Sequence, residues 1–386
     1  MTGLATTATY GQAWSAPATD QRFLLIFLRG GYDALSAVIP TGSDFYYESR
    51  PTLAVPRPDA GNARSALALD RDWSLHPALR DSLYPLWQQG QVAFVPFAGS
   101  EDLTRSHFET QDTIELGQPL SARRDYRSGF MGRLAQQVEG CRPIAFSAQP
   151  PITFQGHRVV PNIIISPTAS YAMNDRQAAL ISGMYRGHRL ERAIVEGLSA
   201  ESRARAIAQE MAAASGGAAE TSSFERAARR VGGLMKADYN IAFMDVGGWD
   251  THVNQDNGLG QFSDKISQLG RGLSALVNTL GPEIWRNTTV VVVSEFGRTF
   301  RENGDQGTDH GHGSIYWVLG GSVKGGRLLG PQVKLTPETL NQARDLQVLT
   351  NYRSLLGGLF ERLYGLDRKR LESVFPQSSP NSIGLV

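Results

Sequence analysis

Short apolar runs alternate with helix-like patterns along most of the chain. Residues 23–28 (FLLIFL) form a continuous apolar run that ends at Arg29-Gly30-Gly31, and the same form recurs at residues 92–97, 241–246 and 288–294. Runs of this length are typical of strands buried on both faces of a parallel sheet. Helical spacing of apolar residues occurs at residues 79–89, 108–116, 262–280 and 352–364. The alternation predicts an α/β fold, with a central, mostly parallel sheet and helices on both faces.

One long stretch departs from this alternation. Residues 170–236 are helical in pattern almost throughout and rich in Ala, Arg and Glu, with a Gly-rich break at residues 215–217. We interpret the stretch as a helical insertion in, or a cap on, a single α/β domain over residues 22–386. The pattern equally suits a dimerisation arm, so a homo-oligomer formed through this insertion is a second interpretation.

Charge and cysteine content narrow the classes of partner and metal site. The 386 residues include 38 Lys+Arg and 37 Asp+Glu, a net charge of +1 that argues against a nucleic-acid partner. Cys141 is the only cysteine, which excludes an intramolecular disulfide and a cysteine-rich zinc site. No apolar run reaches the roughly 18 residues of a membrane-spanning helix, so no membrane span is expected.

The first 21 residues carry little charge and are rich in Ala, Thr, Ser and Gly. Ser15-Ala16-Pro17-Ala18 loosely fits a signal cleavage site, but a basic region and a clear apolar region are missing. Two interpretations remain: a flexible N-terminal tail of a cytoplasmic protein, or the remnant of an export signal.

Polar clusters follow the predicted strands. In chain order they contain Asp33; Thr104, Arg105, Ser106 and His107; Asp250 and His252; Glu295 and Arg298; and Asp309, His310 and His312. Ligands of open α/β sheets bind beyond the carboxyl ends of the strands, and imidazoles with carboxylates build oxygen- and nitrogen-ligated metal sites. Each cluster taken alone is also explained by turn formers, helix caps or solvated loop histidines. His76, His157 and His188 lack a carboxylate at a useful spacing and are left out of the predicted site.

Ser106 is predicted at or near a helix N-terminus, where backbone N–H groups and the helix dipole favour an anion. Its hydroxyl could act as a nucleophile toward phosphorus or sulfur. Alternatively, Thr104 or Ser106 caps the helix, with Glu109 completing a capping box. Arg105 and Arg298 are candidate clamps for a tetrahedral oxyanion, or else surface ion-pair partners.

The segments FLLIFLRGGYDAL, RSHFETQ, FMDVGGWDTH, VVVVSEFGRT and DHGHG, in this order, resemble a known family. It is the large, mostly bacterial family called domain of unknown function 1501, whose fold resembles that of the alkaline phosphatase and sulfatase superfamily. The resemblance covers essentially the whole chain after residue 21. It implies an alkaline-phosphatase-like sheet and an exported or periplasmic location, commonly through a twin-arginine signal, although no Arg-Arg pair stands near this N-terminus.

The resemblance also implies a metal site in a fixed order along the chain. Its ligands would be Asp33, Asp250 and His252, with His310 and His312 competing for the last place, and Ser106 would be the nucleophile with Thr104 as the substitute. Glu295-Phe296 stands where the superfamily often has Asp-His, so one imidazole is missing. His107 or the second histidine of the HGH motif could replace it. The full set of candidate ligands is Asp33, His107, Asp250, His252, Glu295, His310 and His312.

Two functions from different classes follow. The first is a metal-dependent hydrolase or transferase that acts on a small anionic phosphate or sulfate ester, with Ser106 attacking and Arg105 or Arg298 steadying the charge. The second is a non-catalytic exported binding or scaffold protein that retains the fold, with a structural metal as an option. Isomerase or lyase chemistry at the same site is a further alternative. Zinc is the expected divalent metal, with Ca, Mn or Mg as alternatives.

Overall fold

The computed structural model describes residues 20–157, 160–164, 175–199, 201–202, 223–256 and 260–386. Nearly all of the predicted N-terminal tail, and residues 203–222 of the predicted insertion, lie outside these ranges. Among the described residues, no helix is both long and apolar enough to cross a bilayer.

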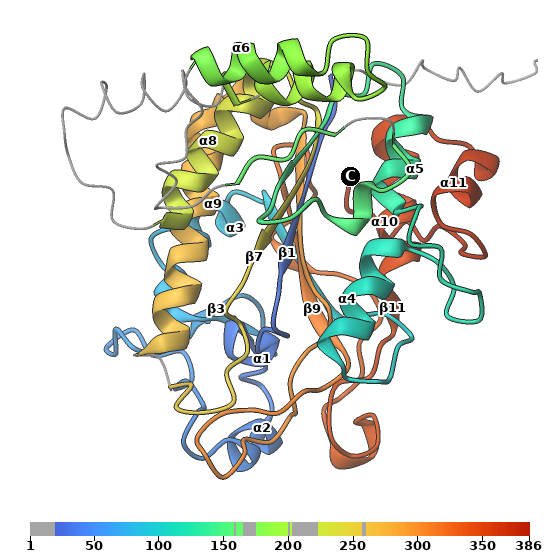
Figure 1. The fold of residues 1–386 in the computed structure, drawn as a ribbon. Helices are drawn as coiled ribbons and strands as arrows, with labels where there is room; N and C mark the ends of the chain where they lie inside the picture. The colour runs from blue at the N-terminus through green and yellow to red at the C-terminus, as the bar shows by residue number, and fades with distance from the viewer. Residues whose placement is uncertain (1–19, 158–159, 165–174, 200, 203–222, 257–259) are drawn as a thin grey trace, which may run out of the picture.

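An eight-stranded sheet forms the centre of the structure (Figure 1). From one edge to the other its strands are β10 (Arg327–Leu328), β5 (Val92–Gly99), β9 (Ser314–Gly320), β8 (Thr288–Ser294), β1 (Arg22–Leu28), β7 (Ile241–Val246) and β6 (Pro143–Phe146), with β11 (Thr350–Asn351) also paired to β5. Only β9 runs antiparallel to its neighbours in this sheet. The predicted mostly parallel α/β fold is therefore confirmed, and the four predicted strands correspond to β1, β5, β7 and β8.

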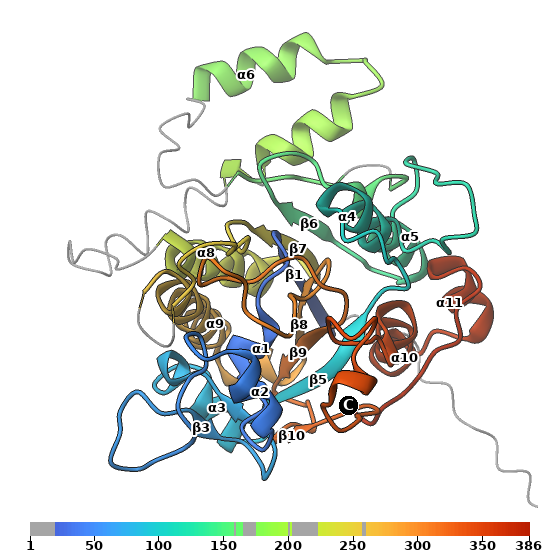
Figure 2. The same cartoon turned by 90° about the horizontal axis from the view of Figure 1, so that it is seen from below.

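Helices cover both faces of the sheet (Figures 1 and 2). On one face lie α3 (Tyr84–Gln88), α8 (Ser223–Ala237) and α9 (Gln261–Arg286), and on the other α4 (His107–Leu116), α5 (Phe130–Gln137), α10 (Tyr352–Tyr364) and α11 (Arg368–Val374). Strand β1 alternates between the two cores: Leu24, Ile26 and Leu28 pack on the α8–α9 side, and Phe23, Leu25 and Phe27 on the α10 side. A strand buried on both faces has no polar side, which is why its sequence is one continuous apolar run.

The remaining elements are short. They are α1 (Ala34–Ala37), α2 (Asp44–Ser49), α6 (Asp175–Met184), the 3₁₀ turns η1 (Pro77–Leu79), η2 (Ile152–Phe154) and η3 (Pro337–Thr339), and a small antiparallel sheet of β2 (Val38–Ile39), β4 (Ser74–Leu75) and β3 (Leu67–Ala68).

Two predicted helices differ from the structure at their bounds. The helix predicted at residues 79–89 is split into η1 and α3, because Pro85 has no N–H to donate and is tolerated only in the first turn of α3. The helix predicted at residues 262–280 corresponds to α9, which continues to Arg286 across a kink at Gly281, where φ is 73°.

The helical segment that contains α6 lies at the end of the sheet where the strands begin (Figure 1). Arg192 and Glu196 of this segment line the same groove as Arg142, directly before β6, and Asp238, three residues before β7. The segment is therefore on the opposite side from the loops that follow the strands.

Candidate metal centre

The three central strands end at the same level. Leu28 at the end of β1 pairs with Val246 of β7 and with Ser294 of β8, so the loops after all three strands leave the sheet together. The loop after β1 approaches the loop after β7 closely at Gly30. A Cβ atom there would lie 2.7 Å from the backbone nitrogen of Asp250, and φ is +120°. Only glycine accommodates both constraints.

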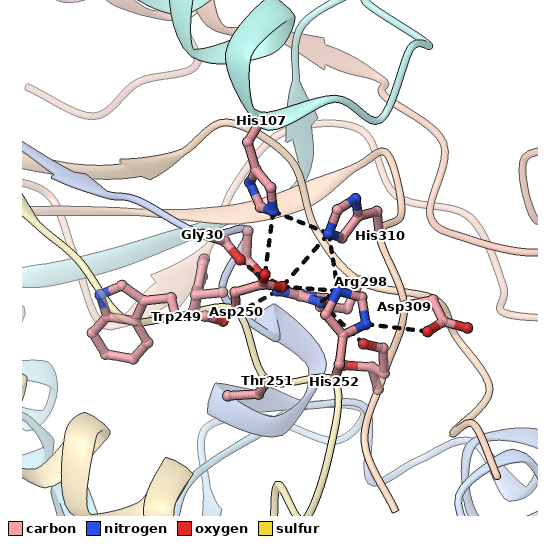
Figure 3. A network of polar contacts seen from close by, with 12 residues as sticks. Gly30, His107, Trp249, Asp250, Thr251, His252, Arg298, Asp309 and His310 are labelled. Carbon is pink, nitrogen blue, oxygen red and sulfur yellow. Dashed lines mark hydrogen bonds and ion pairs between the residues drawn. The ribbon is translucent and has the colours of Figure 1, made fainter. Parts of the chain in front are cut away.

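Four side chains from three segments meet in front of these loops (Figure 3). His107 comes from the first residue of α4, Asp250 and His252 from the loop after β7, and His310 from the segment that bridges to Arg298. We call these four residues the metal cluster. His107, Asp250 and His310 each place a ligand atom within 4.8 Å of the others.

The donor atoms of His310 and Asp250 are at ligand spacing from those of both His107 and His252. The Nε2 atom of His310 lies 3.0 Å from Nε2 of His107 and 3.0 Å from Nε2 of His252. The Asp250 carboxylate lies 3.0 Å from Nε2 of His252, 3.5 Å from that of His310 and 3.6 Å from that of His107. Two ligands of a tetrahedral zinc ion are separated by about 3.3 Å, a value that follows from Zn–N bonds of about 2.05 Å.

Each histidine of the metal cluster is oriented through its other ring nitrogen. The Nδ1–H group of His107 donates to Glu295 at 2.8 Å, that of His310 to the Arg105 carbonyl at 2.9 Å, and that of His252 to Asp309 at 3.2 Å. When Nδ1 of a neutral imidazole carries the hydrogen, Nε2 carries the lone pair. The lone pairs of His107 and His252 therefore each face that of His310, beside the Asp250 carboxylate, and a cation would stabilise this arrangement. Carboxylate- or carbonyl-bound imidazoles are also typical of metal-ligating histidines.

The site is open to solvent, and the pKa values of Asp250 and His310 are shifted in the direction that favours the forms able to bind a metal. The side chain of Asp250 is 45% exposed and that of His252 39% exposed. Burial alone would raise the pKa of Asp250, but its hydrogen bond and charge interaction with Arg298 lower that pKa below its ordinary value. Burial lowers the pKa of His310, which favours the neutral imidazole that can bind a metal.

Asp33, a predicted ligand, is not part of the metal cluster. Its carboxylate is fully buried and accepts hydrogen bonds from Arg50 at 2.5 and 3.0 Å, Ser36 at 2.6 Å and Gln255 at 2.5 Å. Burial would raise the pKa of Asp33, but the Arg50 guanidinium lowers it below its ordinary value. We call Asp33, Ser36, Arg50 and Gln255 the buried cluster; its donors use the oxygens that a metal would need.

The buried cluster nevertheless supports the metal cluster. The Gln255 side-chain carbonyl accepts hydrogen bonds from the hydroxyls of Thr251 at 2.7 Å and Thr308 at 3.0 Å. Thr251 stands between Asp250 and His252, and Thr308 precedes Asp309. Gln255 thus ties both ligand-bearing loops to the buried ion pair.

Glu295, another predicted ligand, lies behind His107 instead of beside it. One carboxylate oxygen accepts from His107, from the Gly30 N–H and from Gln111, each at 2.8 Å, and the other accepts from Ser294 at 2.9 Å. Burial would raise the pKa of Glu295, but the hydrogen bonds from His107 and Gln111 hold it below its ordinary value. The buried carboxylate thus orients the His107 ring from behind and does not join the metal cluster.

The HGH motif separates into two environments. His310 joins the metal cluster, whereas His312 is buried beside Asp102 and Asp345, away from the other imidazoles. Phe296 stands where a histidine was expected from the resemblance, but the metal cluster still has three imidazoles because His107 supplies one. The Phe296 ring packs against the rings of His107 and His310, with centroids 4.9 and 5.1 Å apart, and forms an apolar floor under the site.

Both arginines predicted as oxyanion clamps have their guanidinium groups occupied. Arg105 donates to Asp345 and to Gln342, each at 2.9 Å, which is the ion-pair alternative. Arg298 is buried and donates to the carbonyls of Gly30, Gly31 and Thr308 and to Asp250. Arg344 was not predicted from the sequence, but its side chain is 45% exposed and donates to the His310 carbonyl at 3.1 Å.

Ser106 is the N-cap residue of α4 by position, but its hydroxyl accepts no capping hydrogen bond. The Thr104 hydroxyl accepts a long hydrogen bond, 3.4 Å, from the Ser106 N–H and contacts the Thr110 hydroxyl at 3.5 Å, and Glu109 pairs with Arg124. The capping box is therefore absent, and a half-buried serine hydroxyl stands next to His107.

Sequence reasoning missed the residues that orient the ligands. Asp309 was visible only as the first residue of the DHGHG motif, and Gln111 as the residue one helical turn after His107 in RSHFETQ. Gln255 had no signal in the sequence, because its partners Asp33 and Thr308 are 222 and 53 residues away.

Comparisons with known proteins were made with this geometry in hand. No curated protein matched the chain. Similar solved structures include an alkaline phosphatase superfamily protein from Vibrio parahaemolyticus, with 12% identity, 91% of this chain and 69% of that chain covered, and a TM-score of 0.39. The lipoteichoic acid synthase LtaP from Listeria monocytogenes is similar at 8% identity, with 98% and 78% coverage and a TM-score of 0.41. BT1596, a 2-O GAG sulfatase, is similar at 10% identity, with 95% and 74% coverage and a TM-score of 0.39.

One family model matches the chain, over residues 20–375, which is almost the whole of the described α/β domain. The chain belongs to the family described as Protein of unknown function (DUF1501).

Proposed function

We propose that this protein is a metal-dependent hydrolase or transferase that acts on a phosphate or sulfate ester. The observation that carries the proposal is the convergence of three imidazole Nε2 atoms and one carboxylate in an open site. His107, Asp250, His252 and His310 would hold the metal, and their nitrogen-rich set suits zinc best. When bound, a divalent metal supplies Lewis-acid polarisation of the ester oxygens.

Two residues close to the metal cluster in the chain or in contact with it are the candidates for attack on the ester and for binding its anionic oxygens. The Ser106 hydroxyl is not used for capping and stands at the N-terminus of α4, where the helix dipole favours an anion. Ser106 would attack phosphorus or sulfur, the alcohol would leave with a proton, and water or a second alcohol would release the bound group from the serine. Arg344, the exposed guanidinium at the His310 carbonyl, would bind the anionic oxygens.

The ligand-bearing loops are held rigidly, which positions the reacting groups. Arg298 binds carbonyls from the loop after β1 and the carboxylate of Asp250, and Gln255 binds Thr251 and Thr308. Loops that buried hydrogen bonds already fix lose little conformational entropy when a substrate binds.

The test is turnover of a panel of aryl phosphates and aryl sulfates by purified protein supplied with Zn, Mn or Ca. We expect turnover with at least one ester and metal, and loss of at least 100-fold in kcat for Ser106→Ala with an unchanged melting temperature. Ser373→Ala, an exposed serine of α11, is the control and should keep full activity. No turnover by the wild type, or full turnover by Ser106→Ala, would contradict the proposal.

A second candidate function is a non-catalytic binding or scaffold protein with a structural metal. It is favoured by Phe296 and Asp33: an apolar ring stands where the superfamily often has a histidine, and the first predicted carboxylate is sequestered by Arg50. A protein that binds zinc tightly but turns over no ester of the panel would support this function over the first.

A further inference from the structure

Large hydrophobic side chains are exposed in three parts of the described structure. The first comprises Ile164 and, in the helical segment, Leu180, Met184, Leu190 and Val195; the second comprises Leu120 and Tyr126, in the loop after α4; the third comprises Leu103, Phe108 and Val253, which are close to the metal cluster in the chain. Apart from these three groups, no large hydrophobic side chain of the described residues is exposed. Clustered exposure of this kind marks binding surfaces more often than single scattered residues do.

Three of these side chains adjoin the metal cluster in the chain. Phe108, which is 85% exposed, follows His107, and Val253, which is 53% exposed, follows His252. Consecutive α carbons are about 3.8 Å apart, so each apolar residue borders a proposed ligand. Leu103, 49% exposed, lies one short loop before His107.

The exposure of Phe108 follows from the way α4 packs. Residues 107, 111 and 115 share one helix face, and all three bind the body: His107 and Gln111 contact Glu295, and Glu115 pairs with Arg29 at 2.7 Å. Phe108 is about 100° around the helix from this face, so its ring is left exposed next to His107 in the chain. No described side chain covers it.

His107 and His252 approach His310 from two segments, so Phe108 and Val253 border different parts of the site's edge. The half-exposed Arg344 lies at the His310 backbone. A guanidinium group that can bind an anion, that of Arg344, and two exposed apolar side chains, Phe108 and Val253, thus lie on segments that meet at the metal cluster.

We propose that the site selects esters whose alcohol part is a large apolar or aromatic group, with Leu103, Phe108 and Val253 contacting that group. This inference rests on the proposed function and names its substrate class. The ligand is an amphiphile with the anionic head at the metal cluster and the apolar part over Phe108.

The test is binding of phosphonates, which are not hydrolysed, to the full chain loaded with zinc. Dissociation constants would be measured by calorimetry for methylphosphonate, butylphosphonate, octylphosphonate and phenylphosphonate. We expect octylphosphonate and phenylphosphonate to bind at least tenfold more tightly than methylphosphonate. In Phe108→Ser and Val253→Ser variants the ratio should fall below threefold, while affinity for methylphosphonate stays the same. Met184→Ser, an exposed apolar residue of α6, is the matched control and should leave the ratio unchanged.

Equal affinity for all four phosphonates would overturn the inference, and so would a preference that survives in both the Phe108 and the Val253 variants. Binding to phosphatidylcholine vesicles with phosphatidic acid that depends on Phe108, without a preference among the dissolved phosphonates, would also overturn it, in favour of a membrane surface. The preference can be present while no ester is turned over; that result supports amphiphile recognition and contradicts only the proposed reaction. Turnover of small esters without any chain-length preference would contradict only the inference.

Discussion

The buried cluster and the metal cluster are built from similar groups and differ in saturation. In the buried cluster, the Asp33 carboxylate meets donors from Arg50, Ser36 and Gln255, and it has no exposed surface. In the metal cluster, His107 and His252 each turn an imidazole nitrogen without a hydrogen toward that of His310, beside the Asp250 carboxylate, and the side chains are partly exposed. The comparison teaches that two carboxylates that each follow a strand can differ in their surroundings: donors enclose Asp33, whereas Asp250 meets Arg298 on one side and imidazoles on the other.

The two clusters should therefore respond differently to loss of their carboxylate. Asp33→Ala leaves the Arg50 guanidinium buried without its anion, and we expect a loss of about 3–5 kcal/mol in the free energy of unfolding. Asp250→Ala, in metal-free protein, should cost less, because the Asp250 side chain is 45% exposed and water can take the place of its carboxylate beside Arg298. Urea denaturation measures both. Equal losses would contradict the distinction between the clusters.

A buried histidine offers the same contrast in pH dependence. His76 accepts a hydrogen bond from the Ala78 N–H at Nδ1, lies beside Ser263 at Nε2, and burial lowers its pKa to about 4. Its ordinary pKa is about 6.5, so between pH 6.5 and 4 the unfolded chain binds a proton that the folded chain does not. The contribution of His76 to stability is complete above pH 6.5 and is lost as the pH falls to 4, by about 3 kcal/mol in total.

The matched variant is His76→Asn, which keeps a capping acceptor but does not titrate. Denaturation of metal-free protein at a series of pH values should show a slope between pH 6.5 and 4 that is smaller in the variant by about one proton. An identical slope in both proteins would show that His76 does not titrate as its burial requires.

The residues that orient the ligands should matter for metal affinity more than for folding. Glu295→Gln weakens the acceptor of His107, and we expect a loss of about 10- to 100-fold in zinc affinity. The control is Glu109→Gln. Glu109 is on α4, as His107 is, but its carboxylate pairs with Arg124 and not with His107, so this variant should change the zinc affinity less than about twofold. Competition with a chromophoric chelator measures both affinities. Equal affinities for the two variants would remove Glu295 from the supporting role.

The smallest expected effect concerns recognition of the substrate. If the proposed function holds, Arg344→Gln should raise KM about tenfold and change kcat less than twofold, because the half-exposed guanidinium would bind the anion in ground state and transition state alike. Arg344→Lys keeps the charge but not the fork of donors and should recover part of the loss. Steady-state kinetics with the best ester of the panel is the measurement. A fall in kcat with unchanged KM would place Arg344 in the chemistry and not in binding.

The sequence predicted the strands that position the site because buried parallel strands carry an unmistakable apolar run. It missed β9 and β6. Residues 314–320 are as buried as any predicted strand and follow the glycine-rich DHGHG motif, but no prediction was made for them. Strand β6 has four residues and begins with a proline. An apolar pattern this short does not distinguish a strand from a loop.

Residue type and position after a strand indicated where a site would be, but not which residues it contains. Asp33 and Asp250 look equivalent in the sequence, since each follows a strand and a pair of glycines. What separates them is Arg50 and Gln255, which reach Asp33 from 17 and 222 residues away along the chain. Contacts of that kind have no local pattern, and the same holds for Glu295, which turns toward His107 from 188 residues away.

Metal content of the purified protein tests the central claim most directly. After dialysis against a chelating resin and reloading with zinc, elemental analysis should find about one tightly held equivalent per wild-type chain. His310→Ala should lose it, whereas His312→Gln, a change two residues away in the same motif, should keep it, with thermal melting showing that both variants are folded. A wild-type chain that holds no zinc, or two variants that hold the same amount, would contradict the claim that these histidines converge on a metal.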